Sequence, residues 1–179
     1  MTKRAPNALV LAALLAFGGA ASAQQAAAPA GNPLDVIPDK MPFNTPYGAP
    51  ISLARAQTAI SAAMAEADKR GWALNVAVVD SGANLVAFGR MDGAQLASIA
   101  VAEHKARAAA SYRRPTKAFE EGIQKSDYKY LLSLDGIIAS RGGIPLIEDG
   151  KLIGAIGCSG GAGSQDEAAC TVGAATINK

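Results

Sequence analysis

The sequence has few of the residue types from which metal and catalytic sites are usually built. It contains one histidine and two cysteines among 179 residues, and aromatic residues make up 5% of the chain. No cluster of histidine, cysteine and aspartate has metal-ligand spacing, and zinc needs four ligands. The single histidine and the scattered serines give no Ser-His-Asp triad pattern. The composition therefore argues against both a zinc protein and a triad hydrolase.

An excess of charge of one sign is also lacking. The chain has 17 Lys+Arg and 15 Asp+Glu, and two of the basic residues, Lys3 and Arg4, lie in its first few positions. Without those two residues the charges balance at 15 against 15. A neutral chain has no field that attracts nucleic acid or anionic lipid. We expect neither nucleic acid nor a membrane as a partner of the mature protein.

Residues 1–23 have the pattern of a secretory signal peptide. Lys3 and Arg4 are followed by an apolar run over residues 8–17 and by the small-residue cleavage pattern Ala21-Ser22-Ala23. The run is too short to span a membrane, and no other segment approaches the ~20 apolar residues that a span requires. We therefore expect a periplasmic or secreted protein.

Residues 24–50 form an N-terminal arm rich in proline. Dense proline favours extended chain without a core, which is typical of a flexible tether. The arm also carries apolar side chains, and these favour a second interpretation, an arm that lies on a surface such as that of a neighbouring subunit. These apolar residues are Val36, Ile37, Met41, Phe43 and Tyr47.

From residue 51 to the C-terminus, the hydrophobic pattern predicts helices alternating with hairpins. Two hairpins imply an antiparallel sheet whose faces are covered by helices, an α/β (α+β) fold. The expected helices cover 52–70, 94–113 and 164–177, the expected strands cover 74–79, 85–90, 143–148 and 152–159, and short helical pieces fill 116–135.

The glycine-rich stretch GAIGCSGGAGSQDEA, from Gly154 to Ala168, could be a phosphate loop or a structural turn. No Lys-Ser or Lys-Thr pair follows the glycines, and Asp166 and Glu167 would repel a phosphate at the start of the helix. Ser164 and Glu167 have the spacing of a capping box. We favour the structural turn.

Cys158 and Cys170 flank this turn, one on the expected strand and one in the expected helix. Export favours a disulfide. A helix packed on a sheet, however, leaves the Cα atoms rather far apart for the 4.4–6.8 Å that a bridge needs. We expect two buried thiols slightly more than a disulfide.

His104 lies on a helix face of small side chains, formed by Ala97, Ala100, Val101, Ala108 and Ser111. Such a face admits a flat ligand or a closely packed helix. The histidine is then either a surface residue or a ligand of a metal or haem iron. Met91 is a poor second haem ligand, because ~15 Å separates it from His104 along the helix axis. We expect Met91 to pack in the core or a loop.

A basic cluster of Lys105, Arg107, Arg113 and Arg114 lies at and after the end of this helix. Cations there complement the helix dipole. They could also hold carboxylates such as haem propionates. Asp80 and Asp92 follow strands and could act as an acid–base pair, although turn formation explains both equally well.

Four segments in this order resemble one known family: NVAVVDSGANLVAFGRMDGA, AEHKARAAASYRRPT, GGIPLIEDGKLIGAIGCSGG and QDEAAC. The chain is similar, over about residues 51–177, to the haem-binding (haem-degrading, DUF336-type) family. That family includes a glycolate-operon-associated protein and the C-terminal domain of a propanediol-utilisation protein. The resemblance implies a profilin-like sandwich for residues 51–179, assembly into a homo-oligomer, and haem as the bound group, without a settled enzyme activity.

The chain departs from the family at Ala108, where members commonly carry a threonine linked to haem iron. Alanine cannot ligate, so we expect His104, one turn earlier, to be the iron ligand. The resemblance makes Lys105, Arg107 and Arg114 candidates for the propionates. We expect an exported protein that stores, buffers or senses haem. The alternatives are an accessory factor or enzyme for small oxidised metabolites, with a pocket at the Asp80 and Asp92 turns, and a purely structural oligomer subunit.

Overall fold

The computed structural model describes Met1 and residues 33–178. The predicted signal peptide, apart from Met1, lies outside the described residues. The chain divides into two units, Met1–Asp39 and Lys40–Lys179. The described part of the first unit contains a short 3-10 helix, η1 (Pro33–Asp35), in which Leu34 and Asp35 are exposed. The second unit contains the folded domain.

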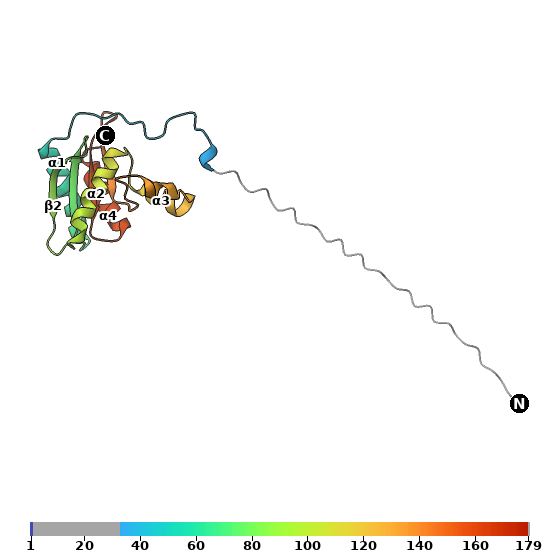
Figure 1. Cartoon of the computed structure of the whole chain (residues 1–179). Coiled ribbons are helices and arrows are strands. Elements are labelled where there is room, and N and C mark those ends of the chain that lie inside the picture. The colour runs from blue at the N-terminus through green and yellow to red at the C-terminus, as the bar shows by residue number, and fades with distance from the viewer. Residues whose placement is uncertain (2–32, 179) are drawn as a thin grey trace. The chain divides into compact units, whose positions relative to one another are not determined.

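The predicted order of helices and hairpins is confirmed in the domain (Figure 1). One helix precedes the first hairpin, a second helix follows it, and another helix follows the second hairpin. Short helical segments occupy residues 117–133, between the second helix and the second hairpin. The elements are α1 (Leu53–Lys69), β1 (Asn75–Asp80), β2 (Leu85–Arg90), α2 (Ala97–Ser111), α3 (Lys117–Ser126), η2 (Lys129–Ser133), β3 (Gly143–Glu148), β4 (Lys151–Ser159) and α4 (Gly163–Ala175).

The four strands form one antiparallel sheet in the order β2-β1-β4-β3. The two hairpins are joined by the central β1–β4 pair, in which Val78 lies opposite Ile156. The predicted antiparallel sheet of two hairpins is therefore confirmed. Because successive side chains of a strand point to opposite sides, each strand contributes one row of side chains to each face of the sheet.

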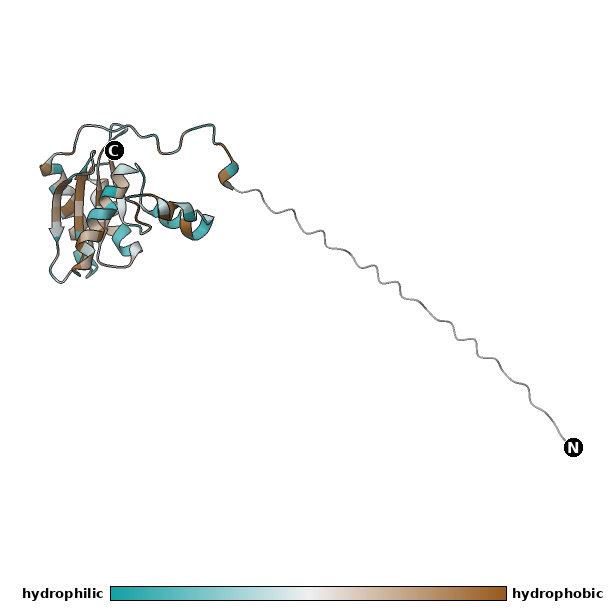
Figure 2. Ribbon diagram, in the orientation of Figure 1, coloured by the Kyte–Doolittle hydropathy of each residue, from teal (hydrophilic) through white to brown (hydrophobic). Residues whose placement is uncertain are grey.

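Helices cover both faces of this sheet. Val76 and Val78 of β1 pack with buried residues of α1 and α4, whereas Ala77 and Val79 pack under α2. Figure 2 shows the hydrophobic residues concentrated on the strands, with a more hydrophilic α3 outside them. The sheet thus separates α1 and α4 on one face from α2 on the other, and this is the mixed α/β sandwich that the sequence predicts.

Helix α2 lies unusually close to the sheet because glycines face it. A Cβ atom placed on Gly157 would overlap the carbonyl oxygen of Ala102 and lie 2.5 Å from the backbone nitrogen of Ala106. A Cβ atom on Gly143 would overlap the carbonyl oxygen of Lys105. The backbone of α2 itself therefore rests on β3 and β4, and no larger residue fits at these two strand positions.

The last residues of the proline-rich arm lie on the arm's own domain. Gly48 donates its N–H to the Leu152 carbonyl at 2.7 Å, and Leu152 donates to the Pro46 carbonyl at 2.8 Å. Ile51 continues the pairing with Ile153 at 2.9 Å. This short run of pairing attaches the arm to the first residues of β4 within the same chain.

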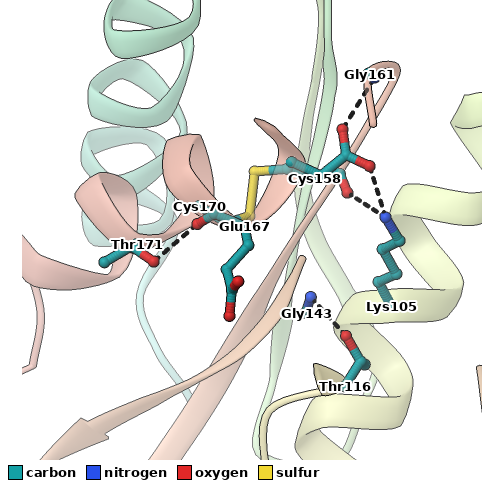
Figure 3. The surroundings of a disulfide bond; sticks show 9 residues. Lys105, Thr116, Gly143, Cys158, Gly161, Glu167, Cys170 and Thr171 are labelled. Atoms are coloured by element: carbon teal, nitrogen blue, oxygen red, sulfur yellow. Dashed lines mark hydrogen bonds and ion pairs between the residues drawn. A yellow bond between two sulfur atoms is a disulfide. The ribbon is translucent and has the colours of Figure 1, made fainter. Parts of the chain in front are cut away.

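Cys158 and Cys170 form a disulfide with their Cα atoms 5.7 Å apart, so the expectation of two thiols is wrong. Small residues on α4 explain the error. Gly173 lies so close to its neighbours that a Cβ atom there would be 2.8 Å from the Ile156 side chain of β4. A helix of this kind approaches a sheet more closely than an ordinary one, which brings the cysteines within bonding reach (Figure 3).

The glycine-rich stretch is a structural turn, but the predicted capping residues are wrong by two positions. Helix α4 begins at Gly163, and the side chain of Gln165 accepts the Ala162 N–H at 2.8 Å. Asp166 accepts the N–H of Gly161 at 3.0 Å. Two N–H groups just before the helix, those of Gly161 and Ala162, are therefore already bonded to the chain's own side chains.

Replacing Gly157 by alanine should lower the free energy of unfolding by about 3 kcal/mol, because the backbone of α2 must move away from the sheet. Gly150→Ala is the matched control. That turn glycine has open space around it and a φ of +71°, so its replacement should cost only about 1 kcal/mol. Urea denaturation of both variants measures the difference, and equal losses would contradict the close packing of α2.

Reducing the disulfide should also destabilise the domain. The bridge joins residues 12 apart in sequence, and a loop of this order contributes about 2–4 kcal/mol. We expect thermal unfolding at a lower temperature with reductant than without it. A Cys158→Ala/Cys170→Ala variant should be equally unstable in both conditions. The natural chain can be exposed to reductant while it is unfolded and then refolded. If its unfolding temperature is the same as without reductant, the bridge is disproved.

Candidate functional site

His104 lies near the middle of α2 on the side of the helix that faces away from the sheet. It is half-buried, and its neighbours Ala97 and Ala100 on the same face are exposed. Val101 is partly covered. The small-residue face that the sequence predicts is therefore accessible over the first half of α2, and the imidazole stands at the end of this accessible part.

At Ala108 the same face is covered by the chain itself, whereas Ser111 at the end of the helix is exposed. Ala108 is 1% exposed and packs with Phe119 of α3 and Leu131 of η2. The Tyr112 and Phe119 rings meet edge to face, with centroids 5.3 Å apart. The α3–η2 segment thus closes the strip of small residues one turn after His104, so the methyl group of Ala108 does not line an open surface.

Lys105 turns away from the surface into the protein (Figure 3). Its Nζ lies 2.7 Å from Oδ2 of Asp166 and 3.1 Å from the Cys158 carbonyl oxygen, and the two paired side chains are 1% and 3% exposed. A buried charge is tolerated only when it is paired and hydrogen-bonded. Lys105 therefore links α2 to the first turn of α4, and its ammonium group does not reach a ligand on the outer face of α2.

Arg107 and Arg113 of the basic cluster contact different partners. Arg107 is 47% exposed and forms an ion pair at 2.8 Å with Glu103, one turn earlier on α2. Arg113 donates to the Thr45 carbonyl at 3.1 Å and lies over the Tyr47 ring. Both arginines are thus held by the helix itself or by the arm.

Helix α2 ends in a Schellman motif with arginine in the position that glycine usually takes. Arg114 donates its backbone N–H to Ala109, and Arg113 donates to Ala110, both at 3.2 Å. Arg113 has a φ of 53°, a left-handed conformation that costs a non-glycine residue about 1 kcal/mol or more. The motif turns the chain sharply and directs Arg114 towards the arm and α3.

Arg114 is half-buried between segments that lie far apart in the sequence. Its guanidinium carbon is 3.7 Å from the centroid of the Phe43 ring and 5.6 Å from that of Phe119. Burial lowers the pKa of Arg114, and the neighbouring Arg113 lowers it further. The sequence pattern indicates Arg114 but not Phe43 as its neighbour, because a separation of 71 positions leaves no local pattern that would connect them.

The other residues considered from the sequence do not form a site. Asp80 ends β1 and accepts N–H bonds from Gly82 and Asn84, as a turn residue does. Asp92 follows β2, and the antiparallel pairing places the end of β2 beside the start of β1. The two aspartates therefore lie at opposite ends of the hairpin, and no single pocket can contain both. Met91 packs in the core, as expected.

Two further properties concern the described residues as a whole. Among residues 33–178, no three side chains of histidine, cysteine, aspartate or glutamate come together in a way that could hold a metal ion. No helix of the same region is long and apolar enough to cross a bilayer.

Comparison with known proteins gives consistent matches. A family model described as "Haem degrading protein HbpS-like" matches residues 51–175. GlcG of Escherichia coli K12 is 35% identical over 109 residues, which cover 61% of this chain and 81% of GlcG. A double mutant of Streptomyces reticuli HbpS has a TM-score of 0.67 at 29% identity, covering 80% of this chain and 97% of HbpS.

PduOC, whose structure was solved as a complex with haem, has a TM-score of 0.65 at 26% identity, and the match covers 73% of this chain and 96% of PduOC. The resemblance drawn from the four sequence segments and the observed α/β sandwich therefore agree with these matches. The family model alone covers well over half of the chain. The chain belongs to the family of HbpS-like haem-degrading proteins.

Proposed function

We propose that this chain is an exported haem-binding protein that stores, buffers or senses haem outside the cytoplasm. The haem complex of PduOC, a protein of the same fold, supports haem as the ligand. The leader pattern of residues 1–23 supports export. The accessible imidazole of His104 beside the exposed Ala97 and Ala100 is the observation that carries the proposal.

The residues on this face fit haem in part. A neutral imidazole is a common axial ligand of haem iron, and small neighbours leave room for a flat ring beside it. Arg107 and Arg114 are the candidates for the propionates, since an arginine can pair with a carboxylate through two N–H groups. Lys105 and Ala108 are left out of the proposed set, because both are buried by the chain's own side chains.

We further propose that the protein is a homo-oligomer. Exposed apolar side chains support this proposal, since Leu96 at the start of α2 and Leu132 in η2 are 71% and 69% exposed. Light scattering of the mature protein measures the subunit number directly.

The first test is haem titration of the mature protein, followed through the Soret band. His104→Ala should remove the absorbance change that axial imidazole ligation produces, and Ala100→Leu should weaken binding at least tenfold by filling the accessible face. Thr171→Ala is the control, because Thr171 is exposed on α4, which lies on the opposite face of the sheet. Its affinity should equal that of the natural chain.

The outcomes separate the two parts of the proposal. A natural chain that does not bind haem would disprove the proposed function. Binding with a spectrum that His104→Ala leaves unchanged would rule out this imidazole as the iron ligand.

A further inference from the structure

Arg114 carries a positive charge that no described carboxylate neutralises. Its Nε donates to the Tyr112 carbonyl at 3.2 Å. A guanidinium has five N–H groups, and within residues 33–178 the other four have no hydrogen-bond or ion-pair partner. The side chain is nevertheless half-buried. Its unbonded nitrogens are not fully buried, so they remain accessible from solvent and offer free donors to an anion.

Several other arginines of the domain are paired with a carboxylate. Arg55 and Arg141 are bonded to Glu148 and Glu120, and these hydrogen bonds raise the pKa of both arginines. Arg70 also stacks on an aromatic ring, that of Trp72 at 5.1 Å, but it pairs with Glu66 at 2.6 Å. Burial instead lowers the pKa of Arg114, because no carboxylate offsets the lost hydration. Among residues 33–178, Arg90 and Arg113 also lack a carboxylate partner, but Arg90 is exposed and Arg113 donates to the Thr45 carbonyl, whereas Nη1 and Nη2 of the half-buried Arg114 have no partner there.

Two aromatic rings determine how Arg114 can be approached. Phe43 of the arm lies against the guanidinium plane at 3.7 Å, and Phe119 of α3 lies farther away at 5.6 Å. Phenyl rings displace water without accepting hydrogen bonds in the guanidinium plane, so a ligand must bind at the edge that carries Nη1 and Nη2. Phe43 holds its position in a left-handed conformation, with a φ of 56°.

We propose that Arg114, covered by Phe43 and flanked by Phe119, is a binding site for a carboxylate. The guanidinium edge offers two parallel N–H groups, which match the two oxygens of a carboxylate. A phosphate has more oxygens to satisfy, and the guanidinium of the neighbouring Arg113 is already bonded to the Thr45 carbonyl. The arm is therefore part of the site, because it supplies the ring that covers the arginine.

The carboxylate has two possible sources. It can be a propionate of haem bound along α2, in which case the inference rests on the proposed function. It can also be a small free carboxylate, in which case the site works without haem. The chemistry at Arg114 is the same in both cases, and two titrations distinguish them.

The first titration uses sodium acetate as the probe, with the haem-free mature protein at constant ionic strength and acetamide as the uncharged comparison. We expect saturable NMR shifts of the Tyr112 and Phe119 amides with acetate and none with acetamide. Arg114→Gln should weaken acetate binding at least tenfold. Arg70→Gln, which removes a stacked but paired arginine, should leave it unchanged.

A second variant keeps the test valid if Arg114→Gln does not fold. Phe43→Leu retains the arginine but exposes it to water, and we expect about a fivefold loss of acetate affinity. Absence of saturable shifts in the natural chain, or equal affinities in the natural chain and Arg114→Gln, would overturn the inference.

The second titration compares haem with its dimethyl ester, in which both propionates are uncharged. A preference for free haem that disappears in Arg114→Gln identifies a propionate as the bound carboxylate. Equal affinity for both porphyrins, together with acetate binding, identifies a small free carboxylate. A protein that binds neither porphyrin disproves the proposed function, while the acetate titration still decides whether Arg114 is a carboxylate site.

Discussion

The close approach of α2 to strands β3 and β4 determines the rest of this structure. Gly143 and Gly157 let the backbone of the helix rest on the backbone of the sheet, and Ala102 and Ala106 are fully buried on its inner side. A helix packed this way cannot rotate about its axis without a clash, since close-packed interiors leave no room for it. His104 is therefore kept on the outer side, and Lys105 is directed towards α4.

Two contacts then fasten α4 to the same end of the sheet. The disulfide joins Cys158 of β4 to Cys170, and the Lys105–Asp166 ion pair reaches the carbonyl of that same Cys158. A buried ion pair adds little net stability but strongly disfavours arrangements that leave one partner alone. The disulfide and the ion pair thus both connect α4 to the end of β4. The ion pair also specifies how α2 and α4 are placed relative to each other.

Local patterns were sufficient to predict the elements, but not the contacts between them. Short hydrophobic runs bounded by turn residues correctly predicted both hairpins, because these signals lie within a few residues of each other. The disulfide was missed because helix–sheet distance depends on small residues such as Gly173, whose effect appears only on packing. Lys105 was expected at the surface for the same kind of reason: its partner Asp166 lies 61 positions away.

Rigid packing of α2 also limits which ligands can use its two candidate groups together. His104 lies seven residues before the end of the helix, about 10 Å along the axis, and Arg114 follows three residues after that end. The sheet holds both positions fixed, so a small carboxylate at Arg114 cannot also contact the imidazole. A ligand that engages both must be large and flat enough to cross the surface between them, over the segment where α3 and η2 cover Ala108. The α3–η2 segment, rather than His104 or Arg114, would then determine which ligand shapes can bind.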